Sequence, residues 1–178
     1  MKPNYLTILI TTLCIFFNAC HNSNTAPQLQ LADSLIDKRA DSALCILEKL
    51  SIEEISNKSA KAMYALLLTE ALDKNFKSHR NDSLILIAVD YYKDNSNNKL
   101  KTKAYYYLGR VYQDNKEYIK ATEAYLTALK TASPNQAPIL QIYNNLALCY
   151  ESQEFYLPAI KTYKESYATA EKMQDKYG

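Results

Sequence analysis

The chain has 178 residues, with 21 Lys and Arg residues against 19 Asp and Glu residues and a formal net charge of +2. This balance lacks the basic surface that nucleic-acid binding needs, so we expect no nucleic-acid partner for this segment. Only 2 glycines occur, and no stretch alternates apolar and polar residues as a strand would, so the sequence predicts an all-α protein. The length suits one domain.

Residues 1–19 have the pattern of an export signal. Lys2 precedes an apolar run from Leu6 to Phe17. At about twelve residues the run is shorter than the roughly twenty that a membrane-spanning helix needs, so a signal peptide is the better interpretation.

The end of this run, Phe17-Asn18-Ala19-Cys20, resembles the lipobox of bacterial lipoproteins, although leucine usually stands where this chain has Phe17. The resemblance implies a signal peptide at 1–19, Cys20 as the lipidated first residue of the mature chain, and a lipidated tether at 20–28. Because His21 is not the aspartate that favours inner-membrane retention, the resemblance implies an outer-membrane lipoprotein facing the periplasm. Surface exposure, plain secretion and a retained membrane anchor stay open as alternatives.

Residues 29–93 are predicted to form two helical hairpins. Apolar residues at helical spacing predict helices at about 29–37 and 40–50, and then at about 59–73 and 83–91. Asn81 or Asp82 is the predicted N-cap of the last of these helices, because a short side-chain oxygen accepts hydrogen bonds from the exposed amides of a first turn.

The remaining chain repeats itself after 38 residues. The matching pairs are Tyr105 and Tyr143, Leu108 and Leu146, Gly109 and Ala147, Tyr112 and Tyr150, Tyr118 and Tyr156, Ala121 and Ala159, and Tyr125 and Tyr163. They define two units, 102–135 and 138–173, with residues 174–178 as the C-terminal end. We expect each unit to be a helix pair, 101–114 with 118–131 and then 138–151 with 156–173. An internal repeat of this size indicates a stacked repeat protein.

The spacing Tyr105-x2-Leu108-Gly109-x2-Tyr112 resembles the first helix of a tetratricopeptide repeat, and Ala121, Tyr125 and Ala128 continue the resemblance. The second unit keeps the pattern at Tyr143, Leu146, Ala147, Tyr150, Ala159 and Tyr163. The resemblance implies a right-handed α-solenoid of about four helical hairpins, in which residues 29–93 are two degenerate members. Small residues in the pattern let helices approach closely, and Leu and Tyr fill the adjacent spaces.

Tetratricopeptide repeats bind partners in a concave groove lined by the first helix of each pair, so the resemblance implies a peptide groove here. Its positions are Lys103, Tyr106, Arg110, Gln113 and Asp114 in one unit, and Gln141, Asn144, Leu148, Glu151 and Ser152 in the next. Lys103 and Arg110 lie two turns apart, and both could face a ligand carboxylate above Tyr106. The alternative that these are only solvated polar positions stays open.

Two further predictions concern burial. Cys45 and Cys149 are predicted to be free, small, buried residues, because units of a solenoid touch only their neighbours. Tyr106 and Tyr107 are predicted to lie beside the core positions of their helix, unlike the tyrosines of the repeat.

Signals of an enzyme are weak. The histidines are His21 and His79, and the chain has neither a Gly-rich phosphate loop nor a nucleophile with neighbouring partners. No Cys or His pair has the spacing of metal ligands. We therefore expect a non-catalytic protein without a cofactor or metal site.

These observations predict a lipid-anchored periplasmic scaffold that binds a protein or peptide partner. Two alternatives stay open. The chain could be the N-terminal sensory part of a longer transmembrane regulator, because the last predicted helix has no polar cover after it. It could also be an outer-membrane biogenesis or nutrient-uptake lipoprotein, a class that uses the same repeats.

Overall fold

The computed structural model describes residues 25–78, 81–133 and 138–175. The predicted lipobox, His79 and the segment 134–137 lie outside this part of the chain. The elements are α2 (Ala26–Leu35), α3 (Ala40–Leu47), the 3-10 helix η2 (Ile52–Glu54), α4 (Lys58–Lys74), α5 (Ser83–Tyr92), α6 (Asn98–Asp114), α7 (Tyr118–Thr131), α8 (Ile139–Ser152) and α9 (Tyr156–Asp175). Every regular element of the described residues is helical, which confirms the all-α prediction.

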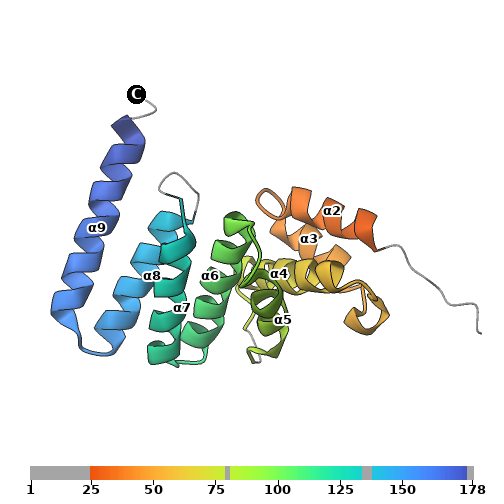
Figure 1. The fold of residues 1–178 in the computed structure, drawn as a ribbon, viewed down its shortest axis with the longest axis horizontal. Coiled ribbons are helices and arrows are strands. Elements are labelled where there is room, and N and C mark those ends of the chain that lie inside the picture. The colour runs from red at the N-terminus through yellow and green to blue at the C-terminus, as the bar shows by residue number, and fades with distance from the viewer. Residues whose placement is uncertain (1–24, 79–80, 134–137, 176–178) are drawn as a thin grey trace, which may run out of the picture.

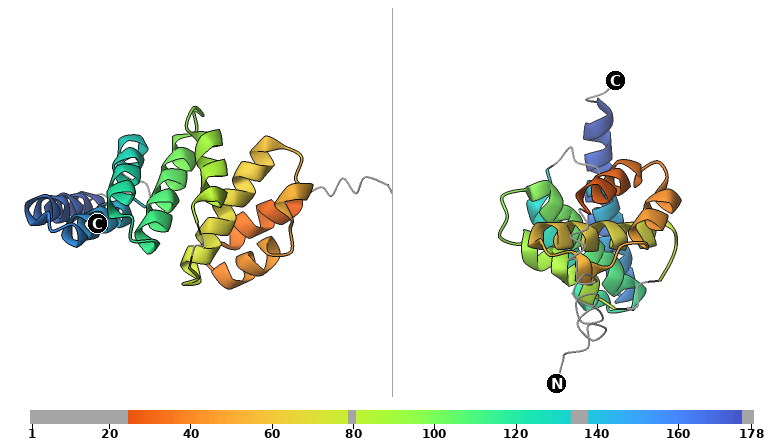
Figure 2. Two further views of the ribbon diagram at one scale, coloured as in Figure 1. Left: turned by 90° about the horizontal axis from the view of Figure 1, so that it is seen from below. Right: turned by 90° about the vertical axis from the view of Figure 1, so that its right-hand side faces the viewer.

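The helices form four hairpins, α2/α3, α4/α5, α6/α7 and α8/α9, which follow one another in a row along the long axis of the molecule (Figures 1 and 2). Each hairpin packs against the next through α3·α4, α5·α6 and α7·α8, while α4 and α8 each also contact α6. The α-solenoid predicted from the repeat is therefore confirmed. Among the described residues, no helix is long and apolar enough to cross a membrane.

Asparagine side chains fix where several helices begin. The Asn57 side chain accepts a hydrogen bond from the Ala60 amide at 3.1 Å, and Asn97 accepts one from the Leu100 amide at 3.2 Å. Before α5 the Asn81 side chain accepts from the Ser83 amide at 3.1 Å. Asp82 is the residue that precedes α5, but its side chain makes no capping bond.

The first helices of the last three hairpins end in the same way. One residue beyond each C-cap has a positive φ: 55° at Phe76, 62° at Lys116 and 62° at Glu154. The amide of the following residue then donates back to a carbonyl of the last turn, from Lys77 to Leu72 at 3.0 Å, Glu117 to Tyr112 at 2.8 Å and Phe155 to Tyr150 at 2.8 Å. This is the left-handed helix ending that usually carries glycine. The α4/α5 hairpin shares this ending although its sequence lacks the repeat residues.

Two apolar clusters hold the row together. One joins α2, α3 and one side of α4, and the other runs from α4 through α5, α6 and α7 to α8. Gly109 lies against the ring of Tyr125, which is fully buried. The small residue on α6 thus makes room for the aromatic residue on α7.

Three burial predictions were wrong. Tyr156, a tyrosine of the repeat that was expected to supply core area, is 61% exposed on α9. Cys45 is exposed, whereas Cys149 is fully buried, because Cys45 lies on the outward side of the short helix α3. Tyr106 and Tyr107 were expected beside the core, yet both are buried. Helix α6 is enclosed by α4, α5, α7 and α8, so it buries more of its circumference than a helix at the end of the row.

Candidate peptide-binding face

The predicted groove residues lie on α6 and α8, and α4 contacts α6 next to them. We call this surface, formed by the first helices of the last three hairpins, the α4–α6–α8 face. Its α4 and α6 parts carry most of the charged groups, whereas its α8 part is mainly neutral.

Lys103 is held by a buried carboxylate of α4. Its Nζ lies 2.5 Å from Oε2 of Glu70, a side chain that is 2% exposed. That oxygen accepts no directed hydrogen bond from the described residues, so the charge of Lys103 is what compensates it. The other oxygen of Glu70 lies 3.1 Å from Nζ of Lys74.

Lys74 extends this network to the first hairpin. Its Nζ also donates to Asp37 at 2.5 Å, beyond the end of α2. Burial acts to lower the pKa of Lys74, but the bond to Asp37 and the charge of Glu70 outweigh it and raise the pKa. Lys74 therefore stays charged. It links the first hairpin to the second, and the Glu70–Lys103 pair continues the network to the third.

Arg110 is also paired within the chain. Its Nε donates to Oδ1 of Asp73 at 2.8 Å, and its terminal nitrogens lie 3.4 Å from the Gln113 amide oxygen and 3.7 Å from Asp114. Burial acts to lower the pKa of Arg110, but the charge of Asp73 reverses this effect and raises the pKa. A ligand carboxylate would have to compete with Asp73 for this guanidinium.

Buried tyrosines lie behind these ion pairs. The Tyr125 hydroxyl donates to the Gln113 amide oxygen at 2.7 Å, and the Tyr106 hydroxyl accepts from Asn145 at 3.3 Å. Burial raises the pKa of Tyr106 and of Tyr125, and for Tyr107 burial and then the charge of Glu70 act in the same direction. These phenols stay neutral at physiological pH.

The α8 part of the face is more open. Gln141 and Asn144 are exposed, and Leu148 is 43% exposed. The side-chain oxygen of Asn144 accepts a hydrogen bond from the Ser166 hydroxyl at 2.9 Å. This bond does not involve the side-chain NH2 group of Asn144.

Glu151 accepts a hydrogen bond from the Tyr163 hydroxyl at 3.1 Å, and the Ser152 hydroxyl donates to the Leu148 carbonyl at 2.9 Å. All five predicted groove positions of α8 are exposed, and a ligand could reach them without breaking an ion pair of the described residues.

Reasoning from sequence missed Glu70 and Asp73, the two α4 residues that pair with the predicted groove cations. The available signal was two carboxylates, three residues apart, of which Glu70 lies inside the largely apolar segment 62–72 and Asp73 directly follows it. Because charged residues are almost never buried unpaired, that pattern could have predicted basic partners on a neighbouring helix.

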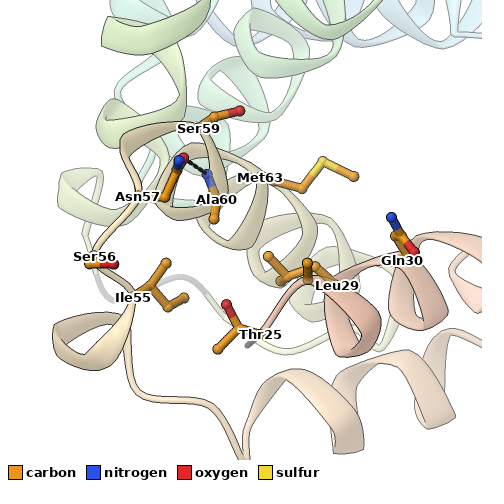
Figure 3. A pocket seen from close by; sticks show the side chains of 10 residues that line it. Thr25, Leu29, Gln30, Ile55, Ser56, Asn57, Ser59, Ala60 and Met63 are labelled. Carbon is orange, nitrogen blue, oxygen red and sulfur yellow. Dashed lines mark hydrogen bonds between the residues drawn. The ribbon is translucent and has the colours of Figure 1, made fainter. Parts of the chain in front are cut away.

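A separate hollow of about 640 Å³ lies at the N-terminal end of the row (Figure 3). The start of α2, the end of the 52–57 segment and the first turns of α4 line it, with Leu29, Ile55 and Met63 as its larger apolar side chains. None of its lining residues is charged. The polar groups of its lining are thus the hydroxyls and amides of Thr25, Gln30, Ser56, Asn57 and Ser59.

The described residues also hold no group of three His, Cys, Asp or Glu side chains that could bind a metal ion.

Comparisons with known proteins agree with this geometry. Residues 101–172 match the family described as tetratricopeptide repeat. Two solved structures, "Crystal structure of MamA" and "Crystal structure of MamA protein", share the fold, with TM-scores of 0.59 and 0.55 and identities of 22% and 23%. The matches cover 87% and 85% of this chain and 83% and 76% of those chains. No curated protein matches the sequence. Over residues 101–172, this helical solenoid is therefore similar to tetratricopeptide repeats.

Proposed function

We propose that this protein is a non-catalytic scaffold that binds a protein or peptide partner along the α4–α6–α8 face, while a lipid on Cys20 anchors it to the outer membrane facing the periplasm. The observation that carries the proposal is the open α8 part of that face, with exposed Gln141 and half-exposed Leu148 on a tetratricopeptide repeat.

The charges of the face suggest which ligand it takes. Glu70 and Asp73 already neutralise Lys103 and Arg110, so a strongly acidic peptide gains little from these cations. Gln141 can hydrogen-bond a peptide backbone, and Leu148 can cover an aliphatic side chain. We therefore expect an extended, weakly charged segment as the ligand.

A photo-crosslinking residue at position 141 tests the face. We expect it to capture a partner in cells, whereas the same residue at the exposed Glu123 of α7 should not. The Leu148→Glu variant should reduce capture at position 141 by at least about tenfold, since a buried charge would replace an apolar contact. Equal capture at positions 141 and 123 would contradict the proposal.

The anchor is tested by the intact mass of the protein isolated from membranes. We expect a chain that begins at Cys20 and carries acyl groups, and we expect Cys20→Ser to release the protein from the membrane. A much larger mass would favour the longer transmembrane regulator. Co-purification with an outer-membrane barrel would favour a role in biogenesis or nutrient uptake.

A further inference from the structure

Helix α9 is covered differently from its counterpart in the preceding hairpin. α7 packs against α6 on one side and α8 on the other, whereas the extensive contacts of α9 are with α8. In Figure 1 α9 stands at the end of the row with α8 as its neighbour. One side of α9 is therefore left uncovered by the described residues.

The 38-residue repeat relates the uncovered side of α9 to the side of α7 that packs against α8. The face of α7 toward α8 includes Tyr118, Thr122 and Leu129. The Gln153 amide donates to the Thr122 hydroxyl at 3.0 Å and to the backbone carbonyl of Tyr118 at 3.4 Å. Leu129 lines a hollow together with Leu146 and Tyr150 of α8. These contacts define a stacking interface between one hairpin and the next.

The equivalent residues of α9 are Tyr156, Ile160 and Tyr167, which we call the α9 stripe. They are 61%, 50% and 66% exposed. Ile160 occupies the position of Thr122, so the centre of the stripe is more apolar than that of its counterpart, while Tyr167 occupies the position of Leu129. Exposed apolar and aromatic side chains that line one side of a helix are typical of a protein interaction site.

The helix that covers α7 shows what would cover the α9 stripe. Ile142, Leu146 and Cys149 of α8 are buried in that cluster, and their spacing is i, i+4 and i+7. One hairpin earlier, α6 places Ala104, Leu108 and Val111 at the same spacing in the same cluster. In both hairpins, the first helix thus presents small or aliphatic side chains at these positions. We expect a helix that packs on the α9 stripe to present the same kinds of side chain.

A second copy of this chain fits the stripe less well. Its α6 and α8 are already enclosed in their own solenoid. If the α9 helices of two copies packed together, the tyrosines of one stripe would face the tyrosines of the other. The repeat instead packs small or aliphatic side chains against these positions.

We propose that the α9 stripe is a docking surface for an amphipathic helix of a partner protein that carries small or aliphatic side chains at i, i+4 and i+7. At i+11, where α8 has Gln153, the partner should carry an apolar residue, since Ile160 cannot accept the bond that Thr122 accepts. This surface is separate from the α4–α6–α8 face and stands whether or not that face binds a peptide.

A synthetic helix tests the proposal. The probe is a labelled peptide with the sequence of residues 138–153, with valine at the Cys149 position to prevent disulfide formation and leucine at the Gln153 position. We measure its fluorescence anisotropy with the purified protein. We expect saturable binding that is at least tenfold weaker for Ile160→Glu. Binding should be unchanged for the control Ile119→Glu, which changes the same residue type at a more exposed position of α7, 68% against 50%. The same peptide with glutamine at the Gln153 position should bind more weakly.

Circular dichroism and the melting temperature confirm that both variants stay folded, as expected for exposed positions. Absence of saturable binding would overturn the proposal, and so would equal affinity for the wild type and Ile160→Glu. A concentration-dependent dimer that Ile160→Glu dissociates, seen by sedimentation without peptide, would assign the stripe to a second copy and would equally overturn it.

Discussion

Gly109 of α6 lies directly against the aromatic ring of Tyr125 of α7. A Cβ atom at position 109 would lie 2.4 Å from Cε1 of Tyr125 and 2.6 Å from its Cδ1. The ring cannot move aside freely, because it is fully buried and its hydroxyl is bonded to Gln113 at 2.7 Å. The glycine is therefore needed for space.

We expect Gly109→Leu to reduce the free energy of unfolding by about 3 kcal/mol or more through overpacking. Gly109→Ala should cost less, about 1 kcal/mol, because the better helix propensity of alanine offsets part of the clash. Urea denaturation gives both values.

Tyr125→Leu supplies the control for this contact. In that background Gly109→Ala should be neutral or stabilising, since the ring that the new methyl group meets is gone. An equal cost of Gly109→Ala in both backgrounds would show that the Tyr125 ring does not set the requirement.

The Arg110–Asp73 pair should contribute to stability as a charge-assisted hydrogen bond. Both side chains are mostly buried, at 25% and 14% exposed. Asp73→Asn should lower the free energy of unfolding by about 2 to 3 kcal/mol, because Arg110 loses its main partner. A double-mutant cycle with Arg110→Gln should give a coupling energy of at least about 1 kcal/mol. Additive effects would mean that the pair does not stabilise the fold.

This pair also affects tests of partner binding. Reversing the charges of Lys103 and Arg110 together should lower the melting temperature, because the new carboxylates would face Glu70 and Asp73. Loss of partner binding by that variant would follow from loss of the fold. Charge reversal at Asp114, which is exposed, is the milder comparison. Equal melting temperatures for the double variant and the wild type would contradict the ion pairing.

Glycine should stabilise the left-handed helix endings. Lys116 and Glu154 both have φ of 62°, a conformation that costs a residue with a Cβ about 1 kcal/mol. Lys116→Gly and Glu154→Gly should each raise the free energy of unfolding by up to about 1 kcal/mol, measured by urea denaturation. Glu123→Gly, at an exposed position in the interior of α7, is the control and should destabilise by about 1 kcal/mol. Destabilisation by the first two changes would contradict this explanation.

The two cysteines should differ in reactivity. In a chain that begins at residue 21, Cys45 should react quickly with a thiol reagent at neutral pH, because it is exposed. Cys149 should react only on unfolding, because it is fully buried and burial raises its pKa to about 11. Mass spectrometry of the labelled peptides distinguishes the sites. Equal labelling rates in the native protein would contradict the burial of Cys149.

Because of the buried Cys149 thiol, we expect the protein to lose stability at alkaline pH. The pKa of this thiol rises from the ordinary value of 9.0 to about 11 on folding, so the folded state holds the proton more tightly. The contribution of this protonated thiol to the free energy of unfolding is complete below about pH 9, and it is lost as the pH rises from about 9 to 11. Two units of pKa correspond to roughly 3 kcal/mol. Cys149→Ala should remove this part of the alkaline loss. If its denaturation curve falls as steeply as that of the wild type, other groups cause the loss.

Particular residues show how far the sequence predicted the fold. The helix expected at 118–131 has those bounds in the structure, and the repeat placed Gly109 on α6 and Tyr125 on α7 before their contact was known. Spacing along one helix determines which residues share a face, so a single chain segment contains this information. The predicted lipidation of Cys20 lies outside the described residues and stays a prediction.

The groove shows where reasoning from sequence ended. Lys103 and Arg110 were placed on the correct helix, but Glu70 and Asp73 lie 33 and 37 positions earlier in the chain, in a hairpin with no recognisable repeat residues. Whether a surface cation is free for a ligand depends on what the neighbouring helix brings to it. Periodicity within α6 does not contain that information.

The sequence by itself determined that the protein is an all-helical repeat, because helical periodicity and the 38-residue repeat are local properties of the chain. The tertiary structure decided the pairing of Lys103 with Glu70, the burial of Tyr106 and Tyr107, and the exposure of Cys45 and the α9 stripe. Each of these depends on the number and register of the neighbouring helices. Burial and charge pairing are relations between segments distant in sequence, and they exist only once the hairpins have stacked.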